Sequence, residues 1–381
     1  MLGSEVRCST RWDDVAAATR DLAELELPEL QAALTPSGIE PYRAKQVFRW
    51  IHRRAVLDWT QMTDLAKQHR AALAEAFHIS TPGLAARYES SDSTQKFLLR
   101  LADGRHIEAV YIPNSPADTF CVSTQVGCAM QCSFCLTAKM GLERNLTAGE
   151  IVGQVRLLRS ELRLLDRPIN IVLMGMGEPL HNYDATVRAL RILTCPDGAA
   201  ISPRRITLST VGIVPALARL AHEPVMPNLA ISLHGTTDEQ RTPLVPVNRR
   251  YPLAEVLRAC RAFPLNRRNR ITFEYVLIRD VNDSVADARR LAGLLKGLRA
   301  KVNVIPLNAA PGIPHERPSA AQIDRFGKAL ADCHVTVSIR KSRGRDIRAA
   351  CGQLLVESGQ PSPGQRLASL IDTPAIPETT D

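Results

Sequence analysis

The sequence FCVSTQVGCAMQCSFC, residues 120–135, joins an apolar run to three closely spaced cysteines. We predict a β-strand over Phe120–Val126, and Cys128, Cys132 and Cys135 follow it in a C-x3-C-x2-C arrangement. Three thiolates so close together can wrap one metal centre. A structural zinc site needs four protein ligands, and no histidine or fourth cysteine lies nearby to complete one. A [4Fe-4S] cluster with one iron left open fits three cysteines. Three unrelated buried thiols are the alternative.

Beyond this strand the chain alternates between apolar runs and helical stretches. Thr147 and Glu150 are spaced as a capping box, which predicts where the first helix begins. Its apolar stripe is Ile151, Val155, Leu158, Leu162 and Leu165. Further strands are predicted at Ile169–Met174, Ile206–Thr210, Leu229–Leu233, Ile271–Ile278 and Val302–Leu307, with Val335–Ile339 as a candidate extra strand. Six βα units predict an α/β fold whose parallel sheet winds into a barrel or partial barrel, with chemistry in the loops at the strands' carboxyl ends.

The residues before the barrel predict accessory elements. Pro41 suits the first position of a helix whose apolar stripe is Ala44, Val47, Phe48 and Ile51, and a second helical pattern covers Leu65 to Phe77. Lys96–Ala102 and Arg105–Ile112 flank Asp103-Gly104, which is a strong hairpin signal. We expect a flexible N-terminus over 1–22, a helical accessory domain over 23–95, a β-hairpin extension over 96–113, the barrel over 114–350, and a final segment with a flexible tail over 351–381.

Composition describes an ordinary globular chain with a basic excess. Of its 381 residues, 45% are hydrophobic and 23% charged, and Lys and Arg (48) outnumber Asp and Glu (39) by nine. A large core can be buried, and the positive charge favours a polyanionic partner. No apolar run approaches the roughly 18 residues that cross a bilayer, and no signal sequence is evident, so we expect a cytoplasmic protein without membrane contact. Nine cysteines in such a chain suggest metal or redox chemistry.

The cysteine triplet at the start of a six-unit α/β chain resembles the radical S-adenosylmethionine (SAM) superfamily. The resemblance implies a partial (β/α)6 barrel whose cluster binds SAM through its open iron and cleaves it to a 5′-deoxyadenosyl radical. In Met174-Gly175-Met176-Gly177-Glu178-Pro179, Gly177 and Glu178 match the superfamily's SAM-amine motif. Polar groups at later strand ends are further candidates for binding the cofactor, although each alone is more simply a satisfied loop hydrogen bond. These candidates are Ser209, Ser232, Leu233, His234 and Asn308.

Several motifs together resemble the RlmN/Cfr family of RNA methyltransferases over residues 25 to 355. They are Ile107–Pro113, Cys121–Cys128, the Gly-Met-Gly-Glu-Pro motif, Ile231–His234 and Ala350–Leu354. The resemblance implies methylation of carbon 2 of an adenosine in 23S rRNA, and also of the adenosine 3′ of the anticodon in tRNA. Methylation at carbon 8, as in Cfr, is the alternative. A non-methylating radical SAM enzyme and an Fe–S or zinc RNA-binding module are the other readings.

The same resemblance assigns catalytic roles to three residues. Cys351 takes a methyl group from one SAM, and a radical from a second SAM activates that methyl for addition to the base. Glu108 matches the residue that accepts the ring proton. Cys121 matches the thiol that attacks Cys351, releases the product and leaves a transient disulfide. From its apolar surroundings alone, Glu108 is either exposed on the polar face of an edge strand or held inward for a purpose, and the exposed position is favoured.

The expected partners are 23S rRNA, tRNA and an electron donor such as flavodoxin or ferredoxin, with the protein acting as a monomer. The target base must leave its stack to reach a buried sulfur. Basic clusters suit phosphate contacts, although some of them will be plain solvated surface. They are Arg204-Arg205, Arg249-Arg250, Arg267-Arg268 with Arg270, and the segment from Arg340 to Arg348. No role is assigned to Cys8, Cys195, Cys260 or Cys333. The residues expected to bind RNA also include the helical domain at 23–95.

Overall fold

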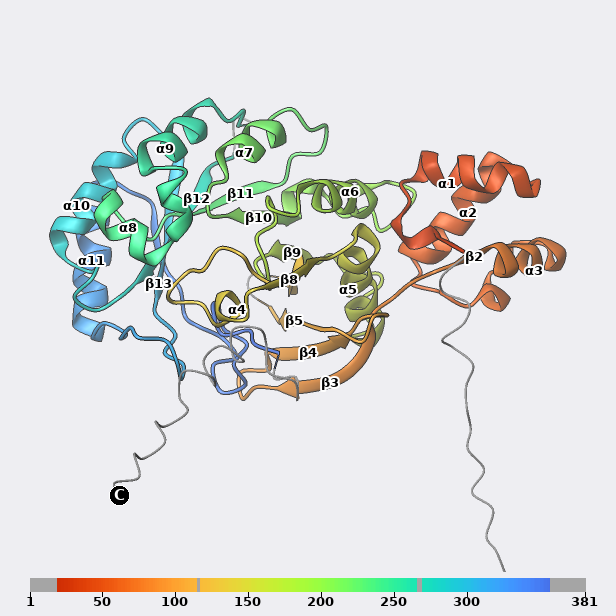
Figure 1. Ribbon diagram of the computed structural model, residues 1–381, viewed down its shortest axis with the longest axis horizontal. Helices are drawn as coiled ribbons and strands as arrows, with labels where there is room; N and C mark the ends of the chain where they lie inside the picture. The colour runs from red at the N-terminus through yellow and green to blue at the C-terminus, as the bar shows by residue number, and fades with distance from the viewer. Residues whose placement is uncertain (1–18, 115–116, 266–268, 357–381) are drawn as a thin grey trace, which may run out of the picture.

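The computed structural model describes residues 19–114, 117–265 and 269–356 (Figure 1). Cys8, Arg267, Arg268 and the expected tail from residue 357 lie outside these ranges. No helix in the described part of the chain is long and apolar enough to cross a membrane.

The centre of the fold is a parallel sheet that does not close. Six strands pair in parallel in chain order, as the sequence predicts, and β14 adds a seventh at the end. The sheet keeps two edges, at β14 and at β3, so the barrel is partial. The parallel strands are β6 (Thr119–Cys121), β9 (Asn170–Leu173), β10 (Ile206–Thr210), β11 (Asn228–Ser232), β12 (Ile271–Leu277), β13 (Ala300–Pro306) and β14 (Val337–Ile339).

Helices cover the convex side of this sheet, and alternation along each strand separates its two faces (Figure 1). On β12, Phe273 and Tyr275 are fully buried towards the helices, where Tyr275 stacks on Phe326. Thr272 and Glu274 face the hollow interior. The helices are α5 (Ala148–Glu161), α6 (Tyr183–Thr194), α7 (Val214–Leu220), α8 (Asp238–Leu244), α9 (Leu253–Ala262), α10 (Val285–Leu294) and α11 (Ala320–Asp332), with short 3-10 helices η4 (Pro203–Arg205) and η5 (Pro246–Arg249).

The helix α5 begins as predicted and ends earlier. The hydroxyl of Thr147 accepts a hydrogen bond from the backbone of Glu150, whose carboxylate accepts one from the backbone of Thr147. At the other end Arg163 adopts a left-handed φ of 55°, and the Leu164 N–H bonds to the Arg159 carbonyl. This pattern closes a helix C-terminus, so of the expected stripe residues Leu162 is the C-cap and Leu165 lies beyond the helix.

The predicted first strand is broken in two, because the chain leaves the sheet after Cys121. Strand β7 (Gln125–Gly127) instead pairs antiparallel with β8 (Leu142–Asn145), and the cysteine loop and α4 (Leu136–Lys139) lie between them. At the break, the Gln154 side chain accepts a bond from the Ser123 N–H and donates one to the Ser123 carbonyl. A glutamine on α5 therefore replaces the missing sheet partner.

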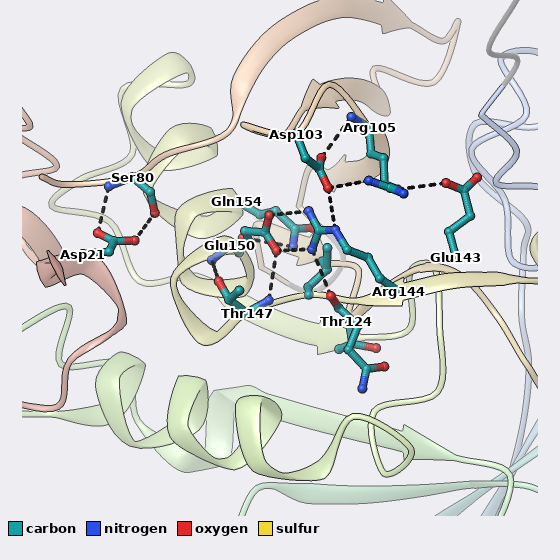
Figure 2. Close-up of polar contacts among 12 residues, drawn as sticks. Asp21, Ser80, Asp103, Arg105, Thr124, Glu143, Arg144, Thr147, Glu150 and Gln154 are labelled. Atoms are coloured by element: carbon teal, nitrogen blue, oxygen red, sulfur yellow. Dashed lines mark hydrogen bonds and ion pairs between the residues drawn. The ribbon is translucent and has the colours of Figure 1, made fainter. Parts of the chain in front are cut away.

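An ion-pair network fixes the hairpin that carries the cysteine loop (Figure 2). Arg144 on β8 donates from Nε to Asp103 at 2.7 Å, and its terminal nitrogens reach both Glu150 oxygens at 2.7 and 2.8 Å. Arg105 extends the network from Asp103 to Glu143. The network joins the Asp103-Gly104 turn, β8 and the start of α5.

The predicted hairpin forms, and a third strand extends it. Strands β4 (Gln95–Arg100) and β5 (His106–Ile112) pair antiparallel, and β5 pairs with β6, so the hairpin continues the barrel sheet to ten strands. Strand β3 (Gly83–Glu89) forms the far edge and was not expected. Because β3 is exposed along nearly its whole length, its sequence carries no alternation that would reveal a strand.

Three helices at the N-terminal end lie to one side of the barrel (Figure 1). The expected stripe on α2, Ala44 to Ile51, is fully buried. On its other face, Lys45 and Arg49 pair with Asp197 after α6, and His52 is buried, so only part of this face is available to solvent or RNA. The elements are β1 (Arg20–Asp21), η1 (Leu22–Glu24), α1 (Leu27–Leu34), η2 (Thr35–Ser37), α2 (Pro41–His52), η3 (Trp59–Gln61), α3 (Lys67–Ala76) and β2 (Phe77–His78).

The end of the expected flexible stretch 1–22 belongs to the fold. Arg20 and Asp21 pair with Phe77 and His78, and Leu22 is completely buried. A two-residue strand has no periodicity, so the sequence offered no signal for this pairing.

Candidate active site

Two adjoining cavities occupy the concave side of the sheet. The barrel cavity, about 860 Å³, runs from Asn170 and Thr272 in the lower part of the strands to Cys121 and Cys351. The cluster cavity, about 160 Å³, lies at the carboxyl ends of the strands beside the cysteine loop. Residues that line both cavities include Cys135, Met174, Glu274, Asn308, Arg340 and Cys351. The meeting point of the cavities is therefore the place where groups from both can react.

The three cysteines of the loop all line the cluster cavity. Burial raises the pKa of Cys128 to about 12, and it also raises the pKa of Cys132, which nearby Cys135 and Cys128 raise further. All three thiols therefore face one buried cavity. Among the described residues, no three Cys, His, Asp or Glu side chains already converge in a geometry for a metal ion. The loop offers three sulfur donors, which fits a cluster that keeps one iron open for another ligand.

Glu178 aims a buried carboxylate at the cluster cavity. One oxygen accepts a bond from the Leu180 N–H at 3.0 Å and the other from the Val211 N–H at 2.9 Å. Burial raises its pKa to about 7, so an ammonium group in the cavity would favour the ionised form. Gly177 has a φ of 101°, and a Cβ there would lie 2.6 Å from the Gln125 side chain. A side chain here would collide with β7, and the backbone of Gly177 lines the cluster cavity.

Other expected cofactor residues lie around the same cavity. Ser209 and Ser232 face each other with hydroxyl oxygens 3.4 Å apart. His234 accepts a bond from the Val276 N–H on Nδ1, and burial lowers its pKa to about 3, so the ring is neutral. Asn308 donates to the Cys351 carbonyl at 3.1 Å, while its buried Oδ1 has no hydrogen-bond partner among the described residues. This orphaned acceptor fits a polar ligand in the cavity.

Leu233 differs from these neighbours. Its side chain is completely buried in the core and lines neither cavity, and its carbonyl accepts a bond from Arg241 at 2.9 Å. Arg241, itself fully buried, also donates to the Val211 carbonyl and thereby ties the ends of β10 and β11 together. Burial lowers the pKa of Arg241 to about 10. Nothing in the sequence around Arg241 distinguishes it from a surface arginine of a helix.

Cys351 lies where the two cavities meet, on a segment bonded to the residues that follow the cluster cysteines. The Gly352 carbonyl accepts a bond from the Leu136 N–H at 2.8 Å, and the Leu354 carbonyl accepts one from the Thr137 hydroxyl at 2.7 Å. Cys121 lines the barrel cavity, and its pKa is raised to about 12 by burial and, next, by Cys351. Both thiols are free. The structure brings the two expected catalytic cysteines together.

Two charged residues at this meeting point escaped sequence reasoning. Arg340, expected in a phosphate-binding segment, lines both cavities, and Cys351 raises the pKa of its guanidinium more than any other group does. Glu274 on β12 is buried and accepts a bond from Asn303 at 2.7 Å. One charged residue in a largely apolar strand does not by itself indicate that its side chain faces the cavity.

Glu108 is buried on β5 rather than exposed, so the interpretation from its neighbours alone is wrong. Only 2% of its surface is accessible, and it lines neither cavity. Its Oε1 pairs with Lys96 at 2.8 Å, and its Oε2 accepts a bond from the Leu355 N–H at 2.8 Å. The carboxylate therefore lies against the segment that carries Cys351.

Known proteins match this chain over most of its length. Residues 122–292 match the model of the radical SAM superfamily, and residues 20–79 match that of the ribosomal RNA large subunit methyltransferase N-terminal domain. A dual-specificity RNA methyltransferase RlmN from Anaeromyxobacter dehalogenans is 47% identical, over 94% of this chain and 98% of that relative. The chain belongs to the RlmN family of radical SAM methyltransferases. The RlmN of Syntrophotalea carbinolica is 52% identical, over 88% of this chain and 89% of the relative.

A solved structure agrees with this family. The crystal structure of a radical SAM methyltransferase from Sphaerobacter thermophilus is 48% identical, covers 88% of this chain and 99% of its own, and superposes with a TM-score of 0.84. The predicted fold class and the predicted cofactors, a [4Fe-4S] cluster and SAM, are confirmed as those of the family. The individual roles expected of Cys351, Cys121, Glu108 and the cofactor-binding residues stay predictions.

Proposed function

We propose that this protein methylates carbon 2 of an adenosine in 23S rRNA and of the adenosine 3′ of the anticodon in tRNA. Relatives named dual-specificity RNA methyltransferases, and the match to a ribosomal RNA methyltransferase N-terminal domain, support RNA as the substrate class. The same relatives favour carbon 2 over the carbon-8 alternative, because they carry the name RlmN. They equally disfavour a non-methylating enzyme or a binding module.

The position of Cys351 carries the proposal. Carbon 2 of adenine is electron-poor and has no lone pair with which to attack a methyl donor, so the carbon must be delivered by another route. When bound, the cluster and SAM supply methyl groups and a carbon radical that abstracts hydrogen. Cys351 faces the cluster cavity on one side and the barrel cavity on the other, so its sulfur can carry a one-carbon unit from cofactor to base.

The other residues complete the cycle. Cys128, Cys132 and Cys135 would hold the cluster, and Glu178, Asn308 and the serines of β10 and β11 would hold SAM. Glu108 would accept the proton from carbon 2. Cys121 would then give up its thiol proton and attack the sulfur of Cys351, forming an S–S bond as the S–C bond to the product breaks. The released carbon would take up a proton and become the methyl group, and two electrons and two protons from a reductant would restore both thiols.

The barrel cavity suits a nucleotide. Five cations besides Arg340 line it, and they can neutralise phosphates beside a base that has left its stack. They are Arg204, Arg205, Lys301, Lys341 and Arg343. Arg204, Arg205, Lys341 and Arg343 belong to the predicted basic clusters, whereas Lys301 does not. The proposal assigns all five to RNA, together with the helical accessory region at 23–95.

The test is a set of cysteine variants assayed anaerobically on 23S rRNA fragments and tRNA, with nucleosides identified by mass spectrometry. Wild type should form 2-methyladenosine in both RNAs, and C351A should form none. C121A should stop after covalent attachment to RNA. C260A, which removes a buried thiol on α9, is the matched control and should keep its turnover. Formation of 8-methyladenosine, or undiminished turnover by C351A, would reject the proposal.

The finer partner assignments belong to the same proposal. A family member of this kind needs one electron to reduce its cluster, which supports a donor such as flavodoxin or ferredoxin. We propose that the protein acts as a monomer in the cytoplasm, where its RNA substrates are found. Mass measurement in solution and reconstitution with each purified donor test these points.

A further inference from the structure

We propose that Lys96 is the positioning residue for Glu108, holding that carboxylate ionised and oriented for the proton transfer. The inference rests on the proposed function, which assigns proton acceptance to Glu108.

The sheet register brings the two residues together. Lys96 lies opposite Val110 and Leu98 lies opposite Glu108, so Lys96 and Glu108 are diagonal neighbours on one face of the β4–β5 pair. Their charged atoms are 2.8 Å apart, and their side chains are only 10% and 3% exposed. The ring of Tyr88 on β3 lies 5.3 Å from the Lys96 nitrogen, in cation–π range. The ammonium is therefore held between an aromatic ring and a carboxylate.

Stability alone does not account for this pair. Two charges removed from water pay a desolvation cost that their attraction often only matches, and apolar residues of similar size commonly do as well in such a position. On the same face of the strands, Leu98 and Val110 are apolar, and Val110 is almost completely buried. A buried ion pair among apolar side chains indicates that the ionised carboxylate itself is needed.

Ionisation matters because only the carboxylate can accept a proton. Addition of the carbon radical leaves an unpaired electron on the ring, which would pass to a one-electron acceptor such as the oxidised cluster. In the transfer assigned to Glu108, the carbon 2–hydrogen bond breaks, its electron pair stays with the ring, and an O–H bond forms on Glu108. Burial without Lys96 would favour the neutral acid, which has no such capacity. The cation opposes this effect and fixes Oε1, which leaves the carboxylate bound to the Cys351 segment through the Leu355 N–H.

Comparing methylation of Cys351 with methylation of RNA distinguishes the positioning role of Lys96 from a general loss of folded protein. Methylation of Cys351 releases only the thiol proton, which the proposal does not assign to Glu108, whereas methylation of RNA requires removal of the proton on carbon 2. We therefore compare Lys96→Met, which keeps the length and removes the charge, with Lys96→Arg, which keeps the charge. Cys351 methylation is followed by peptide mass spectrometry, and RNA turnover and the covalent protein–RNA adduct are followed on the same preparations.

Lys96→Met should methylate Cys351 within about twofold of wild type and lose RNA turnover by about 10- to 100-fold, with adduct accumulating. Deuterium at carbon 2 of the substrate should slow this variant more than wild type. Lys96→Arg should retain most of the turnover. Lys328→Met, which replaces an exposed lysine of α11 outside both cavities, is the matched control and should behave as wild type. Equal losses in Lys96→Met and Lys96→Arg, or wild-type turnover in Lys96→Met, would overturn the inference.

A double variant keeps the test decisive if Lys96→Met folds poorly. Adding Lys96→Met to Glu108→Gln leaves no buried charge unpaired, so the double variant should unfold at a higher temperature than Lys96→Met alone. In that background Lys96→Met should change the residual turnover by less than about twofold. A further tenfold loss would show that Lys96 acts independently of Glu108. Failure of wild type to form 2-methyladenosine would count against the proposed function instead.

Discussion

Asn308 joins the end of β13 to the reactive segment: its Nδ2 donates to the carbonyl of Cys351 at 3.1 Å, and its buried Oδ1 meets no donor in the part of the chain that the structure describes. One amide thus fixes the residue that is expected to carry the methyl group and leaves an acceptor in the cluster cavity. A buried acceptor without a partner is costly, so the arrangement is best explained by a ligand that supplies the missing donor.

Asn308→Ala should therefore weaken SAM binding to the cluster-loaded protein. Loss of one or two hydrogen bonds is worth about 1–2 kcal/mol, which predicts a Kd raised about 5- to 30-fold. Anaerobic calorimetry measures the change. Asn228→Ala, which removes an amide bonded to backbone carbonyls at the start of β11, is the control and should keep wild-type affinity. Unchanged affinity in Asn308→Ala would remove this residue from the SAM site.

SAM binding should depend on pH through Glu178. Its folded pKa, about 7, is raised by burial, so the folded protein binds this proton more tightly than the unfolded chain does. The carboxyl's contribution to stability is therefore present at low pH and declines as pH rises from about 4.5 to 7. An ammonium group bound beside Glu178 favours the ionised form, so SAM affinity should rise about tenfold between pH 6 and 8.

Glu178→Gln provides the comparison, because the amide keeps the shape and does not titrate. Its SAM affinity should be weaker at pH 8 and nearly flat across the same pH range. Titrations at pH 6, 7 and 8 on both proteins decide the point. An equal pH slope in the two proteins would assign the dependence to another group.

Loading of the cluster should reorganise the cysteine loop. Wild type reconstituted with iron and sulfide should hold about four irons, and Cys132→Ala should hold far fewer, because two sulfurs cannot retain a cubane. Hydrogen exchange over residues 128–135 should slow on loading in wild type only. Cys333→Ala, which removes an exposed thiol remote from the loop, is the matched control and should load fully. Full iron content in Cys132→Ala would contradict the assignment.

The features that local sequence patterns could predict are those with a regular period or a fixed spacing. Continuous apolar runs between helical stretches predicted the parallel strands, and the Thr147–Glu150 capping box predicted the start of α5. The break after Cys121 could not be predicted, because it depends on Gln154, a residue distant in sequence, replacing the sheet partner of Ser123. Strand β3 was missed for the opposite reason, since an exposed strand has no buried face to pattern.

The site divides in the same way. The spacing of Cys128, Cys132 and Cys135 predicted them as cluster ligands. Their positions at the ends of predicted strands identified Glu178 and His234 as candidate site residues. The burial of Lys96, Arg241 and Arg340 could not be predicted in this way. The sequence does not distinguish a buried lysine or arginine from an exposed one, because burial depends on the tertiary packing around the side chain. Glu108 was misjudged from its neighbours because the strand β5 became internal once β4 and β6 paired with it on either side.

The segment that carries Cys351 should loosen when its contact with the β3–β4 turn is removed. Asp346 accepts bonds from the Ser90 hydroxyl at 2.5 Å and the Ser91 N–H at 3.1 Å, and Asp92 in that turn accepts one from the Gly344 N–H at 3.1 Å. Because these reciprocal bonds hold the segment from both sides, Asp346→Ala should speed hydrogen exchange over residues 340–350 and lower turnover about tenfold. SAM affinity should stay at the wild-type value, since the Asn308 contact is untouched. Asp332→Ala, at the end of α11, controls for loss of a surface carboxylate. Exchange rates like those of wild type in Asp346→Ala would show that the bonds to Leu136 and Thr137 hold the segment without help from the turn.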